Sequence, residues 1–174
     1  MQRKCLKLAL LLLLVGLLPS MAEAQERKFQ ATVIGFEEVP ALSTPAAGTF
    51  DMRIDFGDTG FNYTLTYSGL VGNVLQSHTH FGQKGVNGGI VVFFCTNLGN
   101  GPPGTQACPQ SGTITGRITP VDVGAGAAAQ GIAVGEFAEL LRAIRAGIAY
   151  VNVHSSVFPG GEIRGQLVPT PKAQ

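Results

Sequence analysis

The stretch GTFDMRIDFGDTGFNYTLTYSGL, residues 48–70, decides the fold class. Apolar side chains occupy every second position on both sides of the turn sequence GDTG: Phe50, Met52, Ile54 and Phe56, then Phe61, Tyr63, Leu65 and Tyr67. Successive side chains of a strand point to opposite faces, so each half has one apolar face and one polar face. Two such strands around a glycine-containing turn predict an antiparallel hairpin.

The rest of the chain extends this pattern with one exception. Further strands are predicted at residues 27–40, 88–95, 112–119, 150–154 and 161–168, the first of them ended by Pro40. The segment QSHTHFG, residues 76–82, is taken as part of another strand. Residues 135–147 instead carry apolar side chains at helical spacing, with Gly147 placed to end the helix. The sequence therefore predicts a mainly β domain, an antiparallel β-sandwich or Greek-key barrel (immunoglobulin-like or superoxide-dismutase-like), with one short amphipathic helix. A plain antiparallel meander is the alternative.

The first residues have the features of a signal peptide. A basic segment precedes an apolar run at residues 8–18, and Ala22-Glu23-Ala24 is a small-x-small cleavage sequence. The run is short for a membrane span, and no second apolar stretch of spanning length follows. We expect a signal peptide at 1–24, one domain at 25–168 and a disordered tail at 169–174. The protein is then secreted or periplasmic without a membrane span, and an uncleaved N-terminal anchor is the alternative.

Charge narrows the range of partners. The whole chain has 12 basic and 11 acidic residues, and the predicted leader contains three of the basic and one of the acidic ones. Residues 25–174 therefore have nine basic and ten acidic residues, a net charge of −1. Such a chain lacks the basic surface that nucleic acids and anionic membranes attract. An unidentified protein or small ligand remains as the partner.

Two cysteines remain after the predicted cleavage. Cys95 and Cys108 flank TNLGNGPPGTQA, a segment rich in glycine and proline. Their spacing is too wide for a CxxC redox or metal motif, and export favours oxidation, so we expect a disulfide. Closing a loop of this length stabilises the fold by roughly 3 kcal/mol in the chain-entropy model.

All three histidines fall in two strands. His78 and His80 point to one face of their strand, about 7 Å apart, with Thr79 on the other face. In the strand YVNVH, His154 shares its face with Tyr150 and Asn152. Histidines at positions i and i+2 of a strand can offer two imidazoles to one metal ion. The sequence therefore makes His78, His80 and His154 candidate ligands of copper or zinc.

The last strand supplies the remaining polar candidates. Glu162 and Arg164 share one of its faces, and a turn at residues 157–161 brings Glu162 towards His154. Glu162, or water, could complete the metal site, or Glu162 could accept a proton from a ligating imidazole, whereas Arg164 would pair with a carboxylate. The alternative is a polar cluster of hydrogen-bonded, neutral imidazoles, with Tyr150, Asn152 and Arg164, that fixes strand register without any cofactor.

Other catalytic signatures are not found in the sequence. There is no G-x-S-x-G elbow, P-loop or dinucleotide fingerprint. Glu162 and His154 could be imagined as a hydrolase pair, but they stand in no recognisable catalytic frame. We expect no enzymatic activity.

Two motifs resemble those of the CHRD (chordin) domain family. The first motif is HTHFGQKGVNGGIVVFF, which combines His-x-His with a Gly-x-Asn-Gly turn at residues 85–88 and an apolar strand at 90–94. The second motif is YVNVHSSVFPGGEIRGQL. It combines Tyr-x-Asn-x-His at residues 150–154 with Pro-x-Gly-Glu-x-Arg-Gly-Gln at residues 159–166. The resemblance covers residues 29–168. Thr79 departs from the pattern, which often has an apolar residue there, but this side chain faces away from the histidines.

The resemblance implies a β-sandwich-like module without established enzymatic activity. Chordin is an extracellular antagonist of bone morphogenetic proteins, a role that does not transfer to a single domain behind a bacterial-type signal. His-x-His on a β-sandwich also resembles copper–zinc superoxide dismutases, but three histidines are too few for their paired metal site. The predicted function is an exported, non-catalytic CHRD binding or structural module; the alternative is an extracytoplasmic copper- or zinc-binding protein.

Overall fold

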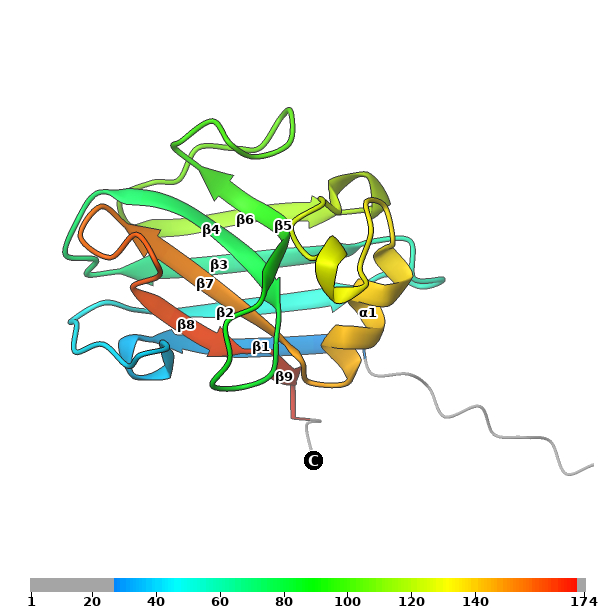
Figure 1. Ribbon diagram of the computed structural model, residues 1–174, viewed down its shortest axis with the longest axis horizontal. Coiled ribbons are helices and arrows are strands. Elements are labelled where there is room, and N and C mark those ends of the chain that lie inside the picture. The colour runs from blue at the N-terminus through cyan, green and yellow to red at the C-terminus, as the bar shows by residue number, and fades with distance from the viewer. Residues whose placement is uncertain (1–26, 172–174) are drawn as a thin grey trace, which may run out of the picture.

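A computed structural model of the chain describes residues 27–171 (Figure 1). The predicted signal peptide, residues 1–24, and residues 172–174 of the predicted tail lie outside them. The described residues form the strands β1 (Lys28–Ile34), β2 (Ala47–Ile54), β3 (Phe61–Ser68), β4 (Val74–Phe81), β5 (Gly89–Thr96), β6 (Gly112–Ile118), β7 (Ala149–Ser155), β8 (Ile163–Gln166) and β9 (Val168–Pro169). They also form one α-helix, α1 (Phe137–Arg145), and the 3₁₀ turns Gly35–Glu37, Pro120–Asp122 and Ala128–Gln130.

The strands build a nearly closed antiparallel barrel with the character of a sandwich. Their order is β5-β4-β7-β8-β1-β2-β3-β6, and β9 pairs with β1. Figure 1 shows β4, β5, β7 and β8 in front of β1, β2, β3 and β6. The two layers join in the middle of this order, where β8 and β1 share the pair Ile34–Arg164. The two ends of the order, β5 and β6, approach each other on the opposite side. On that side, the Tyr63 hydroxyl of β3 donates a hydrogen bond of 3.1 Å to the Phe94 carbonyl of β5. The predicted mainly β fold with one helix is confirmed.

The hairpin that decided the fold class forms as predicted. β2 and β3 pair from Ala47–Ser68 to Ile54–Phe61, and the apolar face of each strand is buried. Phe56 departs from the pattern, because β2 ends at Ile54 and the Phe56 ring lies 81% exposed in the turn, under the Arg27 guanidinium. Apolar alternation thus predicted the pairing correctly but extended the strand too far.

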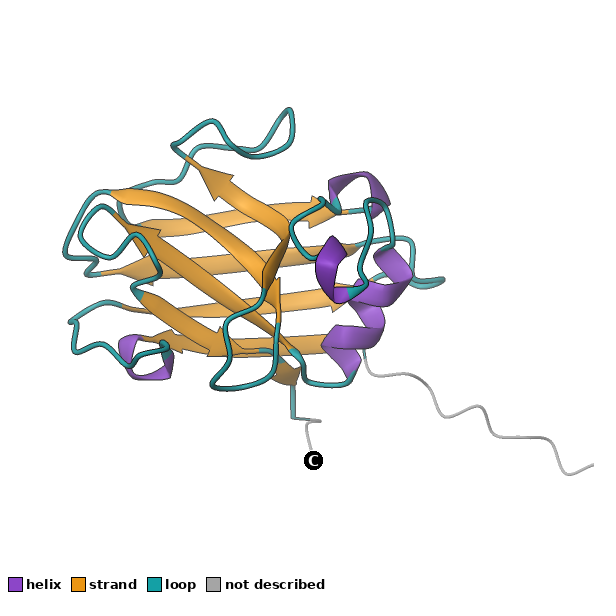
Figure 2. Ribbon diagram, in the orientation of Figure 1, coloured by secondary structure: helices purple, strands orange, loops and turns teal. Residues whose placement is uncertain are grey.

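The core lies between the two layers and is closed at one end by α1 (Figure 2). Phe50 and Tyr63 of the rear layer meet Phe94 of the front layer, with ring centroids 4.8 and 4.5 Å from that of Phe94. Phe137 of α1 stacks on Phe61 at 6.0 Å. The predicted helix is confirmed, and Gly147 after it has the expected positive φ of 71°. These aromatic contacts fix the front layer, so the outer face of β4, β7 and β8 presents its side chains on a rigid support.

The first strand is shorter than predicted, and the last described residues pair with it. β1 ends at Ile34 instead of continuing to Pro40, because the chain turns at Gly35, whose carbonyl accepts hydrogen bonds from the amides of Glu38 and Leu42. This turn carries Glu38 towards the front layer. At the other end, Val168–Pro169 pairs with β1 and the Thr170 amide donates to the Lys28 carbonyl. The contacts with β1 therefore extend to Thr170.

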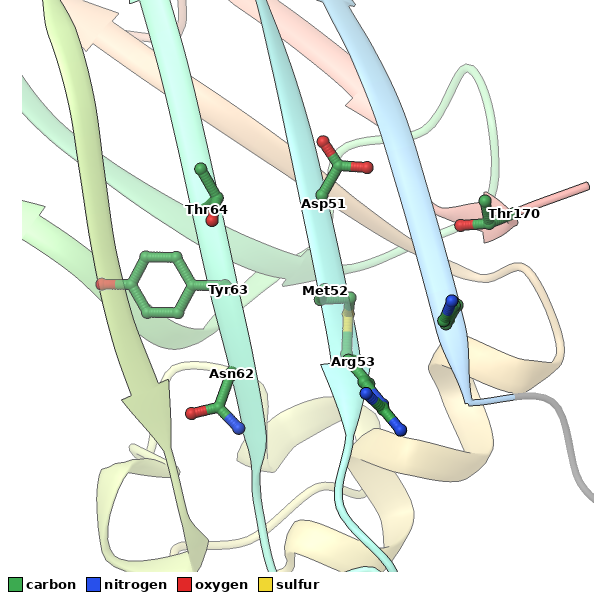
Figure 3. A pocket seen from close by; sticks show the side chains of 8 residues that line it. Asp51, Met52, Arg53, Asn62, Tyr63, Thr64 and Thr170 are labelled. Atoms are coloured by element: carbon green, nitrogen blue, oxygen red, sulfur yellow. The ribbon is translucent and has the colours of Figure 1, made fainter.

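The outer face of the rear layer is polar. A hollow of about 380 Å³ on β2 and β3 contains Asp51, Arg53, Asn62 and Thr64 (Figure 3). Figure 3 shows these side chains spread along neighbouring strands, without converging on one point. The convergent polar side chains of the described chain lie instead on the front layer.

Candidate metal centre

The three histidines meet on the outer face of the front layer. β4 and β7 are adjacent antiparallel strands, with His78 opposite Asn152, His80 opposite Tyr150, and His154 opposite Gln76. One ring nitrogen of each histidine lies within 4.8 Å of the others, and all three side chains are buried. The structure thus brings together the three residues that strand alternation had placed on matching faces. We call them the histidine group.

Two nitrogens of the histidine group already have the separation of metal ligands. His78 Nδ1 lies 3.1 Å from His80 Nε2. Nitrogens bound to one ion at about 2.0–2.1 Å, with bond angles between roughly 95° and 110°, are about 3.0–3.4 Å apart. The ring centroid of His154 lies 4.6 Å from that of His78 and 6.2 Å from that of His80. The His154 ring therefore lies nearer to His78 than to His80, although one nitrogen of each ring lies within 4.8 Å of the others.

Backbone carbonyls fix the tautomers of two of these rings. His80 Nδ1 is 2.8 Å from the Gly88 carbonyl oxygen, and His154 Nδ1 is 2.9 Å from that of Pro159. A carbonyl can only accept, so both Nδ1 atoms carry the proton. In the neutral imidazole Nε2 then has a free lone pair, and a backbone carbonyl on the opposite nitrogen is a usual partner of a metal-ligating histidine.

His78 completes the group but leaves polar atoms unsatisfied. Because His80 Nε2 has the lone pair, His78 Nδ1 is the donor across the 3.1 Å contact. His78 Nε2 and His154 Nε2 are both buried without a hydrogen-bond partner among residues 27–171. A buried, unsatisfied polar atom costs about 1–3 kcal/mol, so such atoms call for an explanation.

Burial keeps the imidazoles neutral. It lowers the pKa of His78 from 6.5 to about 2, helped by repulsion from His154 and His80. Burial likewise lowers the pKa of His80 to about 4; the bond to Gly88 acts in the opposite direction, and His154 and Arg164 add to the lowering. The pKa of His154 is also lowered by burial, against the effect of its bond to Pro159. Near neutral pH the three rings therefore carry no charge, the form that binds metals.

Tyr150 and Arg164 support the group from one side. The Tyr150 ring stacks on His80 with centroids 4.7 Å apart and planes 2° from parallel. The Arg164 guanidinium carbon lies 3.4 Å from the Tyr150 ring centroid on β7. The result is a stack of imidazole, phenol ring and guanidinium that restricts the His80 ring.

Arg164 also fastens the loop that covers this stack. It is 2% exposed and donates hydrogen bonds to the Val86 carbonyl at 2.6 Å and to Asn87 Oδ1 at 3.0 Å. In the same loop, the Gly88 amide donates to the Tyr150 hydroxyl at 3.1 Å. The expected partner of Arg164 was a carboxylate, but its hydrogen bonds within the described chain go to neutral oxygens. Its role is thus to hold residues 82–88, and with them the Gly88 carbonyl, against the histidine group.

Glu162 does not join the histidine group. Its side chain is fully buried, and its Oε1 accepts hydrogen bonds from the Thr44 hydroxyl at 2.7 Å and from the Val71 amide at 2.8 Å. β8 begins only at Ile163, after Gly161 with a φ of 130°, so strand alternation does not reach Glu162. The carboxylate links two loops, and the partner of His154 Nδ1 is the Pro159 carbonyl.

A different carboxyl reaches the polar face. Asn152 donates from Nδ2 to Glu38 Oε1 at 2.6 Å and to the Ile163 carbonyl at 3.2 Å. Burial raises the pKa of Glu38 from 4.5 to about 7, against the lowering effects of Asn152 and Arg164. The sequence did not single out Glu38, because residues 27–40 were predicted to form one continuous strand. The one feature of this segment that indicates a turn is Gly35.

The predicted disulfide is confirmed. Cys95 and Cys108 are bonded, with their Cα atoms 5.0 Å apart. Asn97 inside the loop donates to the Cys108 carbonyl and accepts from the Cys108 amide. The bridge ties the end of β5 to the segment before β6, and it fits an extracellular setting.

Within residues 27–171, no helix has both the length and the apolar character needed to cross a membrane. No curated protein and no solved structure matches the chain. The family model of the CHRD domain matches residues 29–167, which is most of the chain and includes the whole histidine group. The chain therefore belongs to the CHRD domain family.

Proposed function

We propose that this CHRD domain is an exported binding module that binds one copper or zinc ion through His78, His80 and His154. The observation that carries the proposal is the convergence of buried imidazole nitrogens whose tautomers are fixed from outside. The Gly88 and Pro159 carbonyls hold the outer nitrogens of two rings, so their inner nitrogens carry lone pairs. That of His154 has no partner within residues 27–171, and that of His80 accepts from His78 until an ion takes its place. A bound ion would also provide a partner for a histidine nitrogen that is otherwise buried without one.

Copper is expected to bind more tightly than zinc. Imidazole nitrogens suit both metals, and at a given nitrogen site affinity for divalent ions rises through the series to Cu²⁺ and falls again at Zn²⁺. His78 must transfer its proton from Nδ1 to Nε2 before Nδ1 can act as a ligand, whereas the other two rings keep their tautomers. Binding therefore needs little rearrangement and displaces no proton from His80 or His154.

Export is part of the same proposal. A disulfide is stable in an oxidising compartment, where the predicted cleavage after Ala24 would place the domain. Expression of the full chain with its leader, followed by mass spectrometry of the exported product, tests this part. An N-terminus at Gln25 is the expected result, and retention of the uncleaved chain in the membrane would contradict it.

Titration of metal-free protein tests the metal site. Cu²⁺ and Zn²⁺ are added to a chain purified without a histidine tag, and heat release is followed by calorimetry. The wild type is expected to bind one ion, and His80→Gln and His154→Gln each to lose at least about 100-fold in affinity. Thr79→Val is the matched control, because Thr79 lies between two of the ligands but its buried hydroxyl has no hydrogen-bond partner within the described chain.

Two results decide between a metal centre and a purely structural polar cluster. Electron paramagnetic resonance of the Cu²⁺ complex is expected to show coupling to nitrogen in the wild type and in Thr79→Val. If the wild type, His80→Gln and His154→Gln bind both metals equally weakly, the histidine group is a structural cluster and the metal proposal fails.

A further inference from the structure

Three loops meet beside the histidine group and enclose a separate pocket. They are the segment after the first 3₁₀ turn, the loop between β4 and β5, and the turn between β7 and β8 (Figure 1). The pocket has a volume of about 290 Å³. This is close to the lower end of the roughly 300–1,000 Å³ typical of small-molecule sites, so it suits a small group. We call it the Glu38 pocket.

The pocket combines apolar walls with one carboxyl group. Val39, Leu42 and Phe158 are among the apolar walls, and the lining includes Glu38 but no Lys, Arg or His. Glu38 is only 8% exposed, and one of its oxygens accepts a hydrogen bond from Asn152. Among residues 27–171, no salt bridge involves Glu38. A carboxyl in such surroundings gains most from a cationic hydrogen-bond donor that brings its own apolar surface.

Contacts between the three loops hold the pocket in shape. Lys84 forms a salt bridge of 2.9 Å with Glu37, and Asn87 Nδ2 donates to the Val39 carbonyl at 3.3 Å. Gly161 allows the turn to approach Glu38, because a Cβ at this position would lie 2.7 Å from Glu38 Oε1. These contacts join neighbouring loops at the wall and rim of the pocket, which makes the pocket a defined feature of the fold.

We propose that the Glu38 pocket binds a primary ammonium group carried on a short alkyl chain, such as the end of a lysine side chain or a free alkylamine. The ammonium would donate to the Glu38 carboxylate, and the alkyl chain would lie against Val39, Leu42 and Phe158. Burial holds the pKa of Glu38 near 7, so an approaching cation would restore the charged form that burial disfavours. The occupant differs from the metal ion and does not depend on it.

The two sites share the loops that enclose them. Pro159 lines the pocket and its carbonyl accepts from His154, while Asn87 lines the pocket and accepts from Arg164. No histidine lines the pocket. Binding in the Glu38 pocket is therefore expected in metal-free protein, and it can be tested separately from metal binding.

Nuclear magnetic resonance with a pair of probes tests the proposal. Metal-free wild-type protein is titrated with n-butylammonium and, in parallel, with 1-butanol, which has a similar chain but no charge. We expect saturable shifts of the Gly160 and Gly161 amides and of the Asn152 side-chain amide with n-butylammonium, and at least about tenfold weaker binding of 1-butanol.

Variants locate the binding and separate the two proposals. Glu38→Gln retains an oxygen that can accept from Asn152 but removes the charge, and it is expected to lose at least about tenfold in n-butylammonium affinity. Gly160→Leu adds a bulky side chain to the lining of the pocket and should weaken probe binding. His80→Gln should bind the probe like the wild type. Equal binding of both probes, or unchanged binding by Glu38→Gln, would overturn the proposal while leaving the metal centre untouched.

Discussion

Replacing Glu38 by glutamine should change how stability depends on pH. Burial raises the pKa of Glu38 to about 7 in the folded state, whereas the ordinary value, which we take for the unfolded chain, is 4.5. Between these values the folded state binds a proton that the unfolded state releases. Proton binding by Glu38 therefore contributes fully to the free energy of unfolding of the wild type below pH 4.5, and this contribution is lost as the pH rises through 7. The side-chain amide of the Glu38→Gln variant carries no charge at any pH, so this variant should escape the loss.

The size of the effect follows from the two pKa values. A pKa that differs by one between the folded and unfolded states changes the free energy of unfolding by about 1.4 kcal/mol. From pH 5 to pH 8, the titration of Glu38 should therefore lower the free energy of unfolding of the wild type by about 2.5 kcal/mol. The free energy of unfolding of Glu38→Gln, relative to wild type, should rise by this amount over the same range. Because both proteins contain the histidine group, its own titration cancels in the difference.

Urea unfolding at several pH values, in EDTA to exclude metal, measures this difference. Glu37→Gln is the matched control: the Glu37 side chain is 30% exposed and forms a surface salt bridge with Lys84. The free energy of unfolding of Glu37→Gln should stay within about 1 kcal/mol of the wild-type value at all pH values. If the Glu38→Gln difference is equally flat between pH 5 and pH 8, Glu38 is not the buried, proton-binding carboxyl described above.

Two further changes test the support of the site. The double variant Cys95→Ser/Cys108→Ser removes the disulfide and should lower the free energy of unfolding by about 3 kcal/mol. Calorimetry should then show a Tm about 10 °C lower, and an unchanged Tm would refute the loop-entropy argument. Arg164→Gln leaves the Val86 carbonyl without its donor, so it should lower the free energy of unfolding by at least about 2 kcal/mol and speed hydrogen exchange at residues 82–88. Unchanged exchange at these residues would show that the loop does not depend on Arg164.

The hairpin, helix and disulfide could be predicted because their signals are local. Alternation at residues 48–70 and helical spacing at 137–145 each depend on neighbours in sequence, and Cys95 and Cys108 are separated by one short loop. The histidine group needed one further condition, that β4 and β7 be adjacent with their polar faces on the same side. The His-x-His spacing and the alternation of YVNVH predict which side chains share a face within each strand. Neither pattern predicts that β4 and β7 are neighbours, which the structure shows.

The surroundings of the histidines could not be predicted in the same way. The Gly88 and Pro159 carbonyls are backbone groups of loops, and any residue type offers such a carbonyl. Glu38 reaches the polar face only because the chain turns at Gly35. Glu162 shows the reverse case. The predicted strand 161–168 included it and placed it on the face of Arg164, near His154, but β8 begins only at Ile163 and the Glu162 carboxylate bonds to Thr44. Loop conformation, which sequence patterns describe poorly, decides each of these contacts.

The charge around the histidine group favours the lower oxidation state of copper. The three rings are neutral, and the guanidinium of Arg164 is near enough to lower the pKa of His80. Because the energy of burying an ion in a medium of low dielectric grows with the square of its charge, a divalent ion costs more here than a monovalent one. Bound copper should therefore have a reduction potential above that of the aqueous couple.

Voltammetry of the copper complex tests this expectation. The potential should fall when Arg164 is replaced by glutamine, since removal of the nearby positive charge stabilises Cu²⁺ more than Cu⁺. Thr79→Val, which leaves the charges unchanged, should keep the wild-type potential. A wild-type potential below that of aqueous copper would refute the expectation, because the site would then stabilise the divalent ion more than the monovalent one.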